Sequence, residues 1–131
     1  MSMTLTIRDE SLNGESLGEL VLEMLTEKVT VRELIRSRVY QEVQDFNLKN
    51  HQVFRGFIQP EESEKVLNGW KLKQPRLLDW KKQFDLAIEA FETSRILILI
   101  NDRQAESLEE EFTVDPQTRV SFLRLTLLVG G

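Results

Sequence analysis

The pattern of hydrophobic and polar residues at the start of the chain predicts a β-hairpin. Leu5 and Ile7 alternate with polar neighbours, which is the period of a strand with one buried face. Asn13-Gly14 follows, a dipeptide that favours the tight turn of a hairpin. A second apolar run covers residues 20–25. We therefore expect strand, turn and strand, with a loop longer than a tight two-residue turn.

A long amphipathic helix is expected to follow this hairpin. Thr30 and Glu33 have the spacing of a capping box, in which a hydroxyl and a carboxylate satisfy the free amides of the first helical turn. Apolar residues then recur at spacings of three and four, which places them along one side of a helix of roughly four or five turns. These residues are Val31, Leu34, Ile35, Val39, Val43 and Phe46.

The middle of the chain has weaker periodicity and ends in a second strong helical pattern. We expect a short helix over residues 61–67, which Asn68-Gly69 would end by adopting the left-handed cap conformation. Residues 70–72 have the composition of an extended segment. A second long helix is expected to end near Glu92, on an apolar stripe that contains Leu77, Trp80, Phe84, Ile88 and Phe91.

The last third of the sequence predicts strands again. The β-branched run at residues 95–100 is bounded by an Asn-Asp dipeptide, so we expect a buried strand that ends in a turn. A proline turn is expected at residues 115–118 and a final strand over residues 119–128. The order of elements predicts a single α+β domain over residues 1–131, with a mixed sheet packed on a helix.

Composition and charge exclude several classes of function. The chain has no cysteine, so it has no disulfide and no thiol nucleophile. A net charge of −5 repels a phosphate backbone, and we expect no nucleic-acid partner. His51 is the only histidine and makes no metal site by itself. Neither a phosphate-binding glycine loop nor a nucleophile elbow is present, so we expect neither an enzyme nor a permanently bound cofactor.

Two further expectations concern location and surface charge. No signal peptide opens the sequence, and no apolar run is long enough to cross a bilayer, so we expect a cytoplasmic protein with no membrane partner. The acidic run at residues 109–111 is expected to be a solvated turn.

The C-terminal part of the chain carries a recognisable pattern: a strand entering an Asn turn, a short strand, an Asp-containing turn, a strand and a final Gly-Gly. The pattern lies in four segments, at residues 96–104, 108–115, 119–123 and 129–131. It resembles the end of the β-grasp sulfur carriers, namely the small subunit of molybdopterin synthase and the thiamine-pathway sulfur carrier. Residues 123–131 also look like the C-terminal tail of ubiquitin. The resemblance implies a β-grasp (ubiquitin-like) fold.

Residues 52–93 depart from this resemblance, because the small family members have only a short connection there. We interpret these residues as a helical insertion into the β-grasp fold. The insertion makes the chain more similar to the larger bacterial ubiquitin-like proteins that occur beside activating and conjugating enzymes. The sulfur carriers do not predict what such an insertion binds.

The resemblance implies that the working group is the carboxylate at Gly131. An ATP-dependent adenylating enzyme would convert this carboxylate into an acyl-adenylate, which then passes to an acceptor. Gly130 and Gly131 suit this role because glycine lets another backbone approach closely in a narrow channel. ATP is used by the activating enzyme and is not held by the chain itself.

The residues before the two glycines are expected to contact the activating enzyme. Leu127, Leu128 and Val129 are apolar, and an exposed apolar tail is a liability unless a partner receives it. With Arg124 they form the predicted enzyme-binding segment, and residues 127–131 are expected to form a flexible tail. The tail of ubiquitin carries arginines here, which argues against recognition by a ubiquitin-type activating enzyme.

Aromatic residues of the insertion have two interpretations. The helical spacing of Trp80 and Phe84 favours a place in the core. For Trp70, which lies between lysine and glycine neighbours, a partner-binding surface is an equal alternative, because tryptophan is enriched at interfaces. Phe54 and Phe57 form an apolar loop that must either pack inward or meet a partner.

Three functions are compatible with the sequence. The first is a bacterial protein modifier that is joined through Gly131 to amines of a target protein, with an adenylating enzyme, a conjugating enzyme and a deconjugating protease as partners. The second is a sulfur carrier, in which the adenylate becomes a thiocarboxylate. The third is a non-covalent β-grasp interaction module. The insertion favours the first function, because a sulfur carrier needs no additional surface.

Overall fold

The computed structural model describes residues 3–49 and 52–125, which form two compact units. The first unit contains Met1–Leu34 and Glu89–Gly131, and the second contains Ile35–Ile88. The described elements include a mixed sheet and two long helices, which confirms an α+β protein. None of the helices in these residues is long and apolar enough to cross a membrane.

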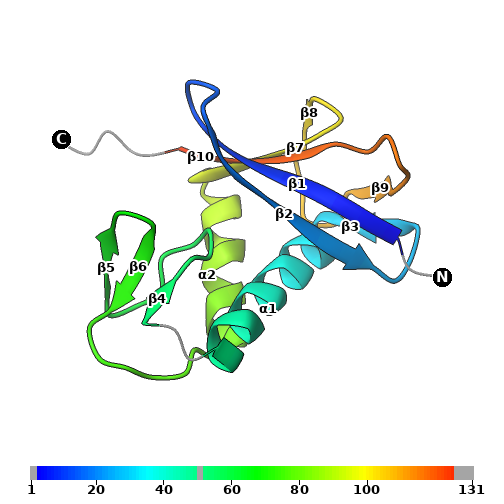
Figure 1. Ribbon diagram of the computed structural model, residues 1–131. Helices are drawn as coiled ribbons and strands as arrows, with labels where there is room; N and C mark the ends of the chain where they lie inside the picture. Colours follow the sequence, from blue (N-terminus) through cyan, green and yellow to red (C-terminus); the bar gives the residue numbers. More distant parts are fainter. Residues whose placement is uncertain (1–2, 50–51, 126–131) are drawn as a thin grey trace. The chain divides into compact units, whose positions relative to one another are not determined.

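The first unit is built on a five-stranded sheet with the order β2-β1-β10-β7-β8 (Figure 1). Its strands are β1 (Met3–Ser11), β2 (Ser16–Met24), β7 (Ile96–Ile100), β8 (Arg103–Gln104) and β10 (Val120–Arg124). β1 and β10 are parallel, whereas the other neighbouring strands are antiparallel. The first and last described strands, β1 and β10, therefore lie side by side. On its other side β1 pairs with β2, and β10 pairs with β7.

Two turns predicted from the sequence are confirmed in this sheet, the first of them as a loop longer than two residues. Gly14 has a φ of 82° in the β1–β2 loop, a conformation that glycine adopts without strain. Asn101 and Asp102 join β7 to β8 with φ values of 51° and 66°. Positive φ at both central residues is typical of the hairpin turn that matches the twist of its strands. The Asn101 side-chain oxygen accepts a hydrogen bond from the Arg119 N–H at 2.9 Å, which ties this turn to the start of β10.

One face of the sheet supplies the core of the first unit. Side chains alternate across a strand, so every second residue of β7 is buried, as are Val120 and Phe122 of β10. The buried members of the sheet are Leu5, Ile7, Leu22, Met24, Ile96, Ile98, Ile100, Val120 and Phe122. Full burial of one such side chain contributes about 1.5–3 kcal/mol, so this face dominates the stability of the unit.

A second, smaller sheet joins β3 (Lys28–Thr30) to β9 (Glu111–Thr113) and leads into helix α1 (Val31–Lys49). The Glu33 N–H donates a hydrogen bond to Thr30 Oγ1 at 3.1 Å, as the capping box predicts. The Glu33 carboxylate accepts from the Thr30 hydroxyl, also at 3.1 Å. The six residues of the predicted apolar stripe of α1 are all at most 5% exposed, which confirms the stripe.

The acidic run at residues 109–111 does more than form a solvated turn. The carbonyls of Glu110 and Leu108 accept hydrogen bonds at 2.9 Å from the N–H groups of Val31 and Arg32, which are free donors at the start of α1. Glu109 forms a 2.6 Å ion pair with Arg32. The run therefore caps the helix from a distant part of the sequence.

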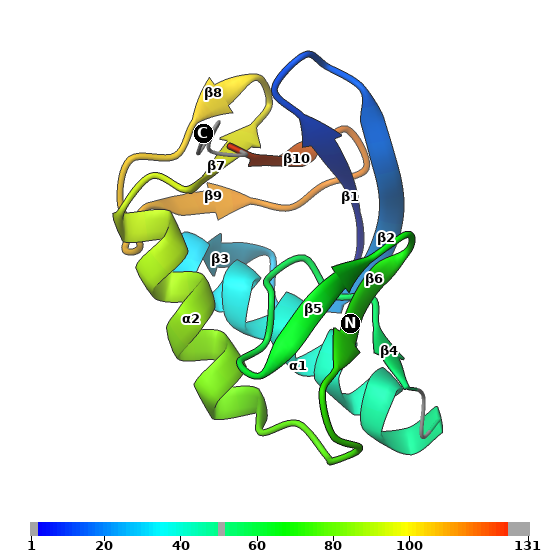
Figure 2. The same ribbon diagram turned by 90° about the vertical axis from the view of Figure 1, so that its left-hand side faces the viewer.

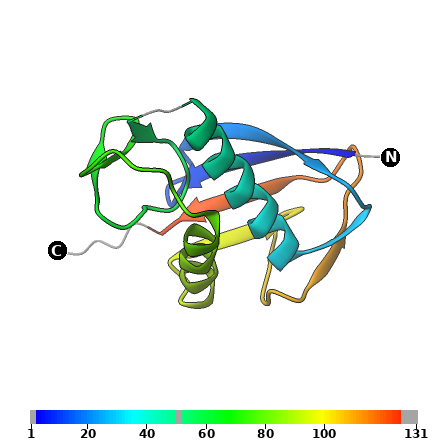
Figure 3. The ribbon, with the colours of Figure 1, turned by 90° about the horizontal axis from the view of Figure 1, so that it is seen from below.

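The second unit contains most of α1, most of α2 (Trp80–Glu92) and a three-stranded sheet (Figure 2). The sheet has the order β4-β6-β5, with antiparallel pairing of β4 (Val53–Phe54), β5 (Ser63–Val66) and β6 (Gly69–Leu72). Within this unit α1 and α2 lie next to each other (Figure 3). The ring of Tyr40 on α1 packs against the ring of Trp80 on α2. The predicted insertion at residues 52–93 is thus only partly helical.

The prediction of a short helix at residues 61–67 is wrong, because the strand β5 occupies most of this segment. Asn68-Gly69 does not end a helix but lies at the turn from β5 to β6. A Cβ atom on Gly69 would lie 2.5 Å from the Phe54 carbonyl oxygen, so only glycine lets β6 approach β4 this closely. Residues 61–67 also lack an apolar stripe whose burial would stabilise a helix. The extended segment predicted at residues 70–72 is confirmed by β6.

Helix α2 is confirmed, but its deepest face differs from the predicted stripe. Asp79 begins the helix, with its carboxylate accepting from the Lys81 N–H at 3.0 Å. The fully buried residues of α2 are Gln83, Ala87 and Ala90, whereas Trp80 and Phe84 are only half-buried. The prediction that Trp80 and Phe84 belong to the core is therefore only partly correct.

Candidate functional site

The predicted working segment begins where β10 ends. Arg124 is the last residue of β10, opposite Ser11 of β1 and Ile96 of β7. The Leu125 N–H donates a hydrogen bond to the Arg95 carbonyl at 3.0 Å. The chain is thus held by the sheet up to its last described residue. The predicted site residues Leu127, Leu128, Val129, Gly130 and Gly131 lie outside the described residues.

A leucine strip lies on the outer face of the sheet and leads towards this point. Leu97 and Leu123 are directly opposite each other on β7 and β10, and Leu99 lies one step further along β7, opposite Ser121. These three leucines are half-buried and alternate with fully buried neighbours such as Ile98 and Phe122. We call Leu97, Leu99 and Leu123 the outer strip. The outer strip is therefore a partly exposed apolar surface on the face of the sheet opposite its core.

The β1–β2 loop adds apolar side chains at the same end of the sheet. Because Ser11 is paired with Arg124, the loop that follows Ser11 lies at the end where β10 finishes. Leu12 in this loop and Leu17 in β2 are 63% and 49% exposed, respectively. The end of the sheet at which β10 finishes is therefore bordered by exposed apolar residues.

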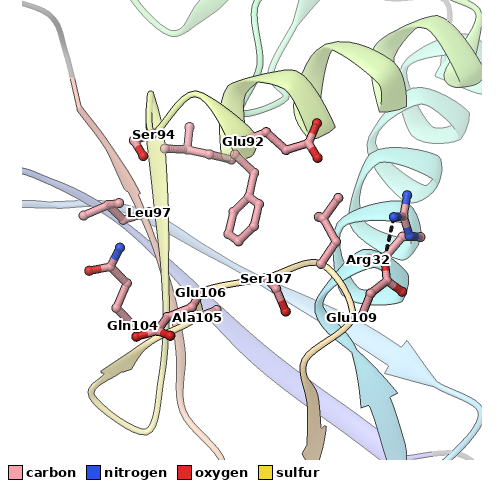
Figure 4. Close-up of a pocket in the computed structure, with 12 residues that line it drawn as sticks. Arg32, Glu92, Ser94, Leu97, Gln104, Ala105, Glu106, Ser107 and Glu109 are labelled. Carbon is pink, nitrogen blue, oxygen red and sulfur yellow. Dashed lines mark hydrogen bonds and ion pairs between the residues drawn. The ribbon is translucent and has the colours of Figure 1, made fainter.

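A hollow of about 550 Å³ lies at the edge of the first unit, beyond the short strand β8 (Figure 4). Ser94 and Leu97 lie on one side of it, and Ala105 and Ser107 line another part of its wall. The Arg32–Glu109 ion pair lies beside it. The lining mixes acids, hydroxyls and one arginine, and contains no pair of side chains with the contact of a nucleophile and its base.

The strongest pKa shift in this region belongs to Glu110. The Glu106 N–H donates a hydrogen bond to the Glu110 carboxylate at 3.1 Å and is the main cause that holds its pKa below the ordinary value. The Arg103 guanidinium, 2.5 Å away, acts in the same direction, whereas burial opposes both. Since this carboxylate is engaged in structural contacts, we assign it to the fold and not to catalysis.

A second hollow of about 380 Å³ lies on the solvent-facing side of the sheet, over β1 and the start of β10. Its lining includes Thr6, Arg8 and the Arg119–Asp102 ion pair, which has a distance of 3.1 Å. Its charged residues are four acids and two arginines, most of them exposed, and they form no cluster that indicates a particular ligand. No group of three or more side chains that could hold a metal ion is found among residues 3–49 and 52–125.

Two of the aromatic residues predicted for a partner surface, Phe54 and Phe57, are buried. Phe54 is 1% exposed and packs edge-to-face on Phe46 with a centroid distance of 5.7 Å. Phe57 is 4% exposed and lies under the Arg38 guanidinium at 4.8 Å. The structure thus places both phenylalanines in the core of the second unit, which excludes them from a partner surface.

Trp70 is neither fully buried in the core nor fully exposed as a partner surface. Its ring is half-buried, its Nε1–H donates a hydrogen bond to the Gly56 carbonyl at 3.1 Å, and the Lys65 ammonium lies 4.8 Å above the ring. These contacts fix the indole within the three-stranded sheet of the second unit. Its role in partner binding stays a prediction.

The sequence did not single out Tyr40, which forms a cluster with Trp80 in the second unit. The ring centroids of Tyr40 and Trp80 are 5.3 Å apart, and Tyr40 is 45% exposed. A signal was present, because Tyr40 directly follows Val39 and so falls outside the buried stripe of α1. An aromatic residue outside the core stripe of a helix is expected at the surface.

Comparisons with protein-family models, with curated proteins and with solved structures find no match to this chain.

Proposed function

We propose that this chain is a ubiquitin-like β-grasp modifier that acts through the carboxylate of Gly131. The observation that carries the proposal is the strand order β2-β1-β10-β7-β8, with the first and last strands parallel in the middle of the sheet. A β-grasp sheet has this arrangement, in which the final strand is inserted between the first hairpin and the later strands. The sequence resemblance of the C-terminal segments supports the same fold.

The position of β10 suits a terminal group that must be presented to an enzyme. A central strand is held by hydrogen bonds on both sides, so its end is a fixed point of departure for whatever follows. The sequence places six residues after Leu125, and the last two are glycines. Six extended residues span at most about 20 Å, which is a useful reach into a partner's channel.

The proposed chemistry uses the terminal carboxylate as a nucleophile on ATP. A carboxylate oxygen of Gly131 attacks the α-phosphorus, the bond to the β-phosphate oxygen breaks, and pyrophosphate leaves. The resulting acyl-adenylate is attacked at its carbonyl carbon by a target amine, and AMP leaves with the bonding electrons. This sequence divides a difficult acyl transfer into easier steps, with the acids and bases supplied by the partner enzymes.

The outer strip supports contact with the activating enzyme. Leu97 and Leu123 lie near the end of β10, so an enzyme that receives the tail is close enough to cover them. Covering half-buried leucines stabilises the complex by about 25 cal/mol for each Å² of apolar surface removed from water. Arg124 and the apolar residues 127–129 continue this contact surface in the proposal.

Intact mass spectrometry tests the proposed function. The chain, with Gly131 as its mature last residue, is incubated with ATP and the adenylating enzyme of the same genome, with and without an amine-bearing target. An amide to a target lysine supports the modifier. Exchange of one terminal oxygen for sulfur would instead assign a sulfur carrier. If neither product forms, and a chain without Gly131 keeps every association, the function is a non-covalent one.

A further inference from the structure

An aromatic cluster lies on the surface of the second unit. Tyr40 and Trp80 meet edge-to-face, with an interplanar angle of 83°, and Trp80 contacts Phe84 with a centroid distance of 6.2 Å. The Arg36 guanidinium lies 5.1 Å from the centre of the Trp80 ring. We call Arg36, Tyr40, Trp80 and Phe84 the aromatic cluster. Its members come from two helices, α1 and α2, of the same unit.

The core of the second unit does not require these rings. Its interior is already filled by residues that are nearly inaccessible: Val39, Val43, Phe46, Phe54, Phe57, Leu72, Leu78 and Ala87. The aromatic cluster lies at the rim, where Tyr40 remains 45% exposed. Tryptophan, tyrosine and arginine together at one surface are the residue types that carry most of the binding energy in protein interfaces.

The backbone next to the cluster presents another large apolar side chain. The Asn47 side chain bonds both backbone groups of Leu78, donating to its carbonyl and accepting from its N–H, each at 2.9 Å. This clamp fixes the segment just before α2 against α1. Leu77, the residue before the clamped one, is 69% exposed. The clamp therefore holds an exposed leucine three residues before Trp80.

Arg36, Lys81 and the Tyr40 hydroxyl are the hydrogen-bond donors at the cluster. The nearby acids Glu33 and Asp79 are engaged in hydrogen bonds at the starts of α1 and α2. In the described parts of the chain, no carboxylate lies within ion-pair distance of Arg36 or Lys81. Lys81 lies three residues before Phe84 on α2, so helix pitch places the two side chains next to each other. The Tyr40 hydroxyl accepts a bond from Gln44 at 3.2 Å and keeps its own proton to donate.

We propose that the aromatic cluster binds an acidic segment of a partner protein that carries a large apolar side chain. The apolar side chain would cover Leu77 and Trp80, while aspartate or glutamate side chains would accept from Arg36, Lys81 and Tyr40. Since this surface does not involve Gly131, the inference is independent of the proposed function.

Selection from short random peptides displayed on phage, with the full-length chain as bait, tests this inference. We expect enrichment of peptides that combine several acidic residues with leucine, phenylalanine or tryptophan. The affinity of one enriched synthetic peptide is then measured by the fluorescence of Trp80 in a chain that carries Trp70→Phe. Tyr40→Ala and Arg36→Glu should each weaken binding about tenfold or more, as truncation of a central interface residue does.

Matched controls separate binding from folding. Leu67→Ser changes a fully exposed residue at the β5–β6 turn and should leave the affinity unchanged. Deletion of Gly131 should also leave it unchanged, which distinguishes this surface from the proposed tail function. Arg36→Glu alters an exposed side chain, so thermal unfolding should show an intact fold. The inference is overturned if enriched peptides lack acidic residues, if they bind Arg36→Glu and Tyr40→Ala as well as the parent chain, or if sedimentation shows only self-association.

Discussion

The Leu125 N–H donates a hydrogen bond to the carbonyl oxygen of Arg95 at a distance of 3.0 Å. This bond extends the pairing of β10 with β7 by one residue beyond Arg124. It holds the last described residue of the chain, and the proposed function concerns the residues that follow it in sequence.

Leu125→Pro should lower the free energy of unfolding by about 1 kcal/mol, because proline removes the donor and leaves the Arg95 carbonyl without it. Urea unfolding measures the change. Leu125→Ala keeps the N–H and provides the control, with a smaller loss from the missing side chain. Equal stability of the proline and alanine variants would show that the bond does not hold the end of the strand.

Thr30→Ala should destabilise the protein by about 1 kcal/mol, because it removes the hydroxyl that accepts from the Glu33 N–H at the start of α1. Thr30→Ser retains the hydroxyl and should recover most of the loss. Denaturant unfolding followed by circular dichroism compares the three chains. If serine and alanine behave alike, the effect comes from side-chain packing and not from the cap.

Glu110 should give stability a specific pH dependence. Its pKa is lowered in the folded chain, so folding favours the ionised carboxylate. This contribution is complete above the ordinary glutamate pKa and is lost as the pH falls through the lowered pKa of the folded state. The difference in unfolding free energy between the parent chain and Glu110→Gln should therefore shrink on acidification. A difference that is constant with pH, or that grows in acid, contradicts this assignment.

Gly69→Ala should destabilise the second unit by more than about 1 kcal/mol, because the added Cβ would lie 2.5 Å from the Phe54 carbonyl oxygen. Gly14 provides a matched control. It also has a positive φ, but a Cβ there meets no atom within 4 Å. Gly14→Asn should therefore be tolerated, because asparagine adopts this conformation readily. Thermal unfolding of both variants tests whether close approach, and not conformation alone, requires glycine at residue 69.

Local signals in the sequence predicted much of the first unit. The alternation around Leu5 and Ile7, the turn at Asn101-Asp102 and the capping residue Thr30 each depend on neighbours in sequence, and each is confirmed. These signals are reliable because strand period, turn conformation and helix caps are set within a few residues. The strand order depends on contacts between segments that are distant in sequence. No local pattern specifies such contacts.

The errors also have physical causes. Asn68-Gly69 suits both a helix stop and a hairpin turn, and only the approach of β6 to Phe54 decides between them. Trp80 has helical spacing, but the small residues Ala87 and Ala90 and the buried Gln83 occupy the deepest face of α2. Gln83 is satisfied there because its amide donates to the Ile58 carbonyl at 2.6 Å. Of the candidate site, Arg124 falls at the end of β10, whereas residues 127–131 lie outside the described part of the chain.

The central claim is that the Gly131 carboxylate is adenylated. ATP–pyrophosphate exchange measures this step directly, with the adenylating enzyme of the same genome and the chain as the only substrate. We predict exchange that depends on the chain and disappears when Gly131 is removed, while Leu67→Ser leaves it unchanged. Equal exchange with and without Gly131, or exchange that needs no chain at all, would contradict the account.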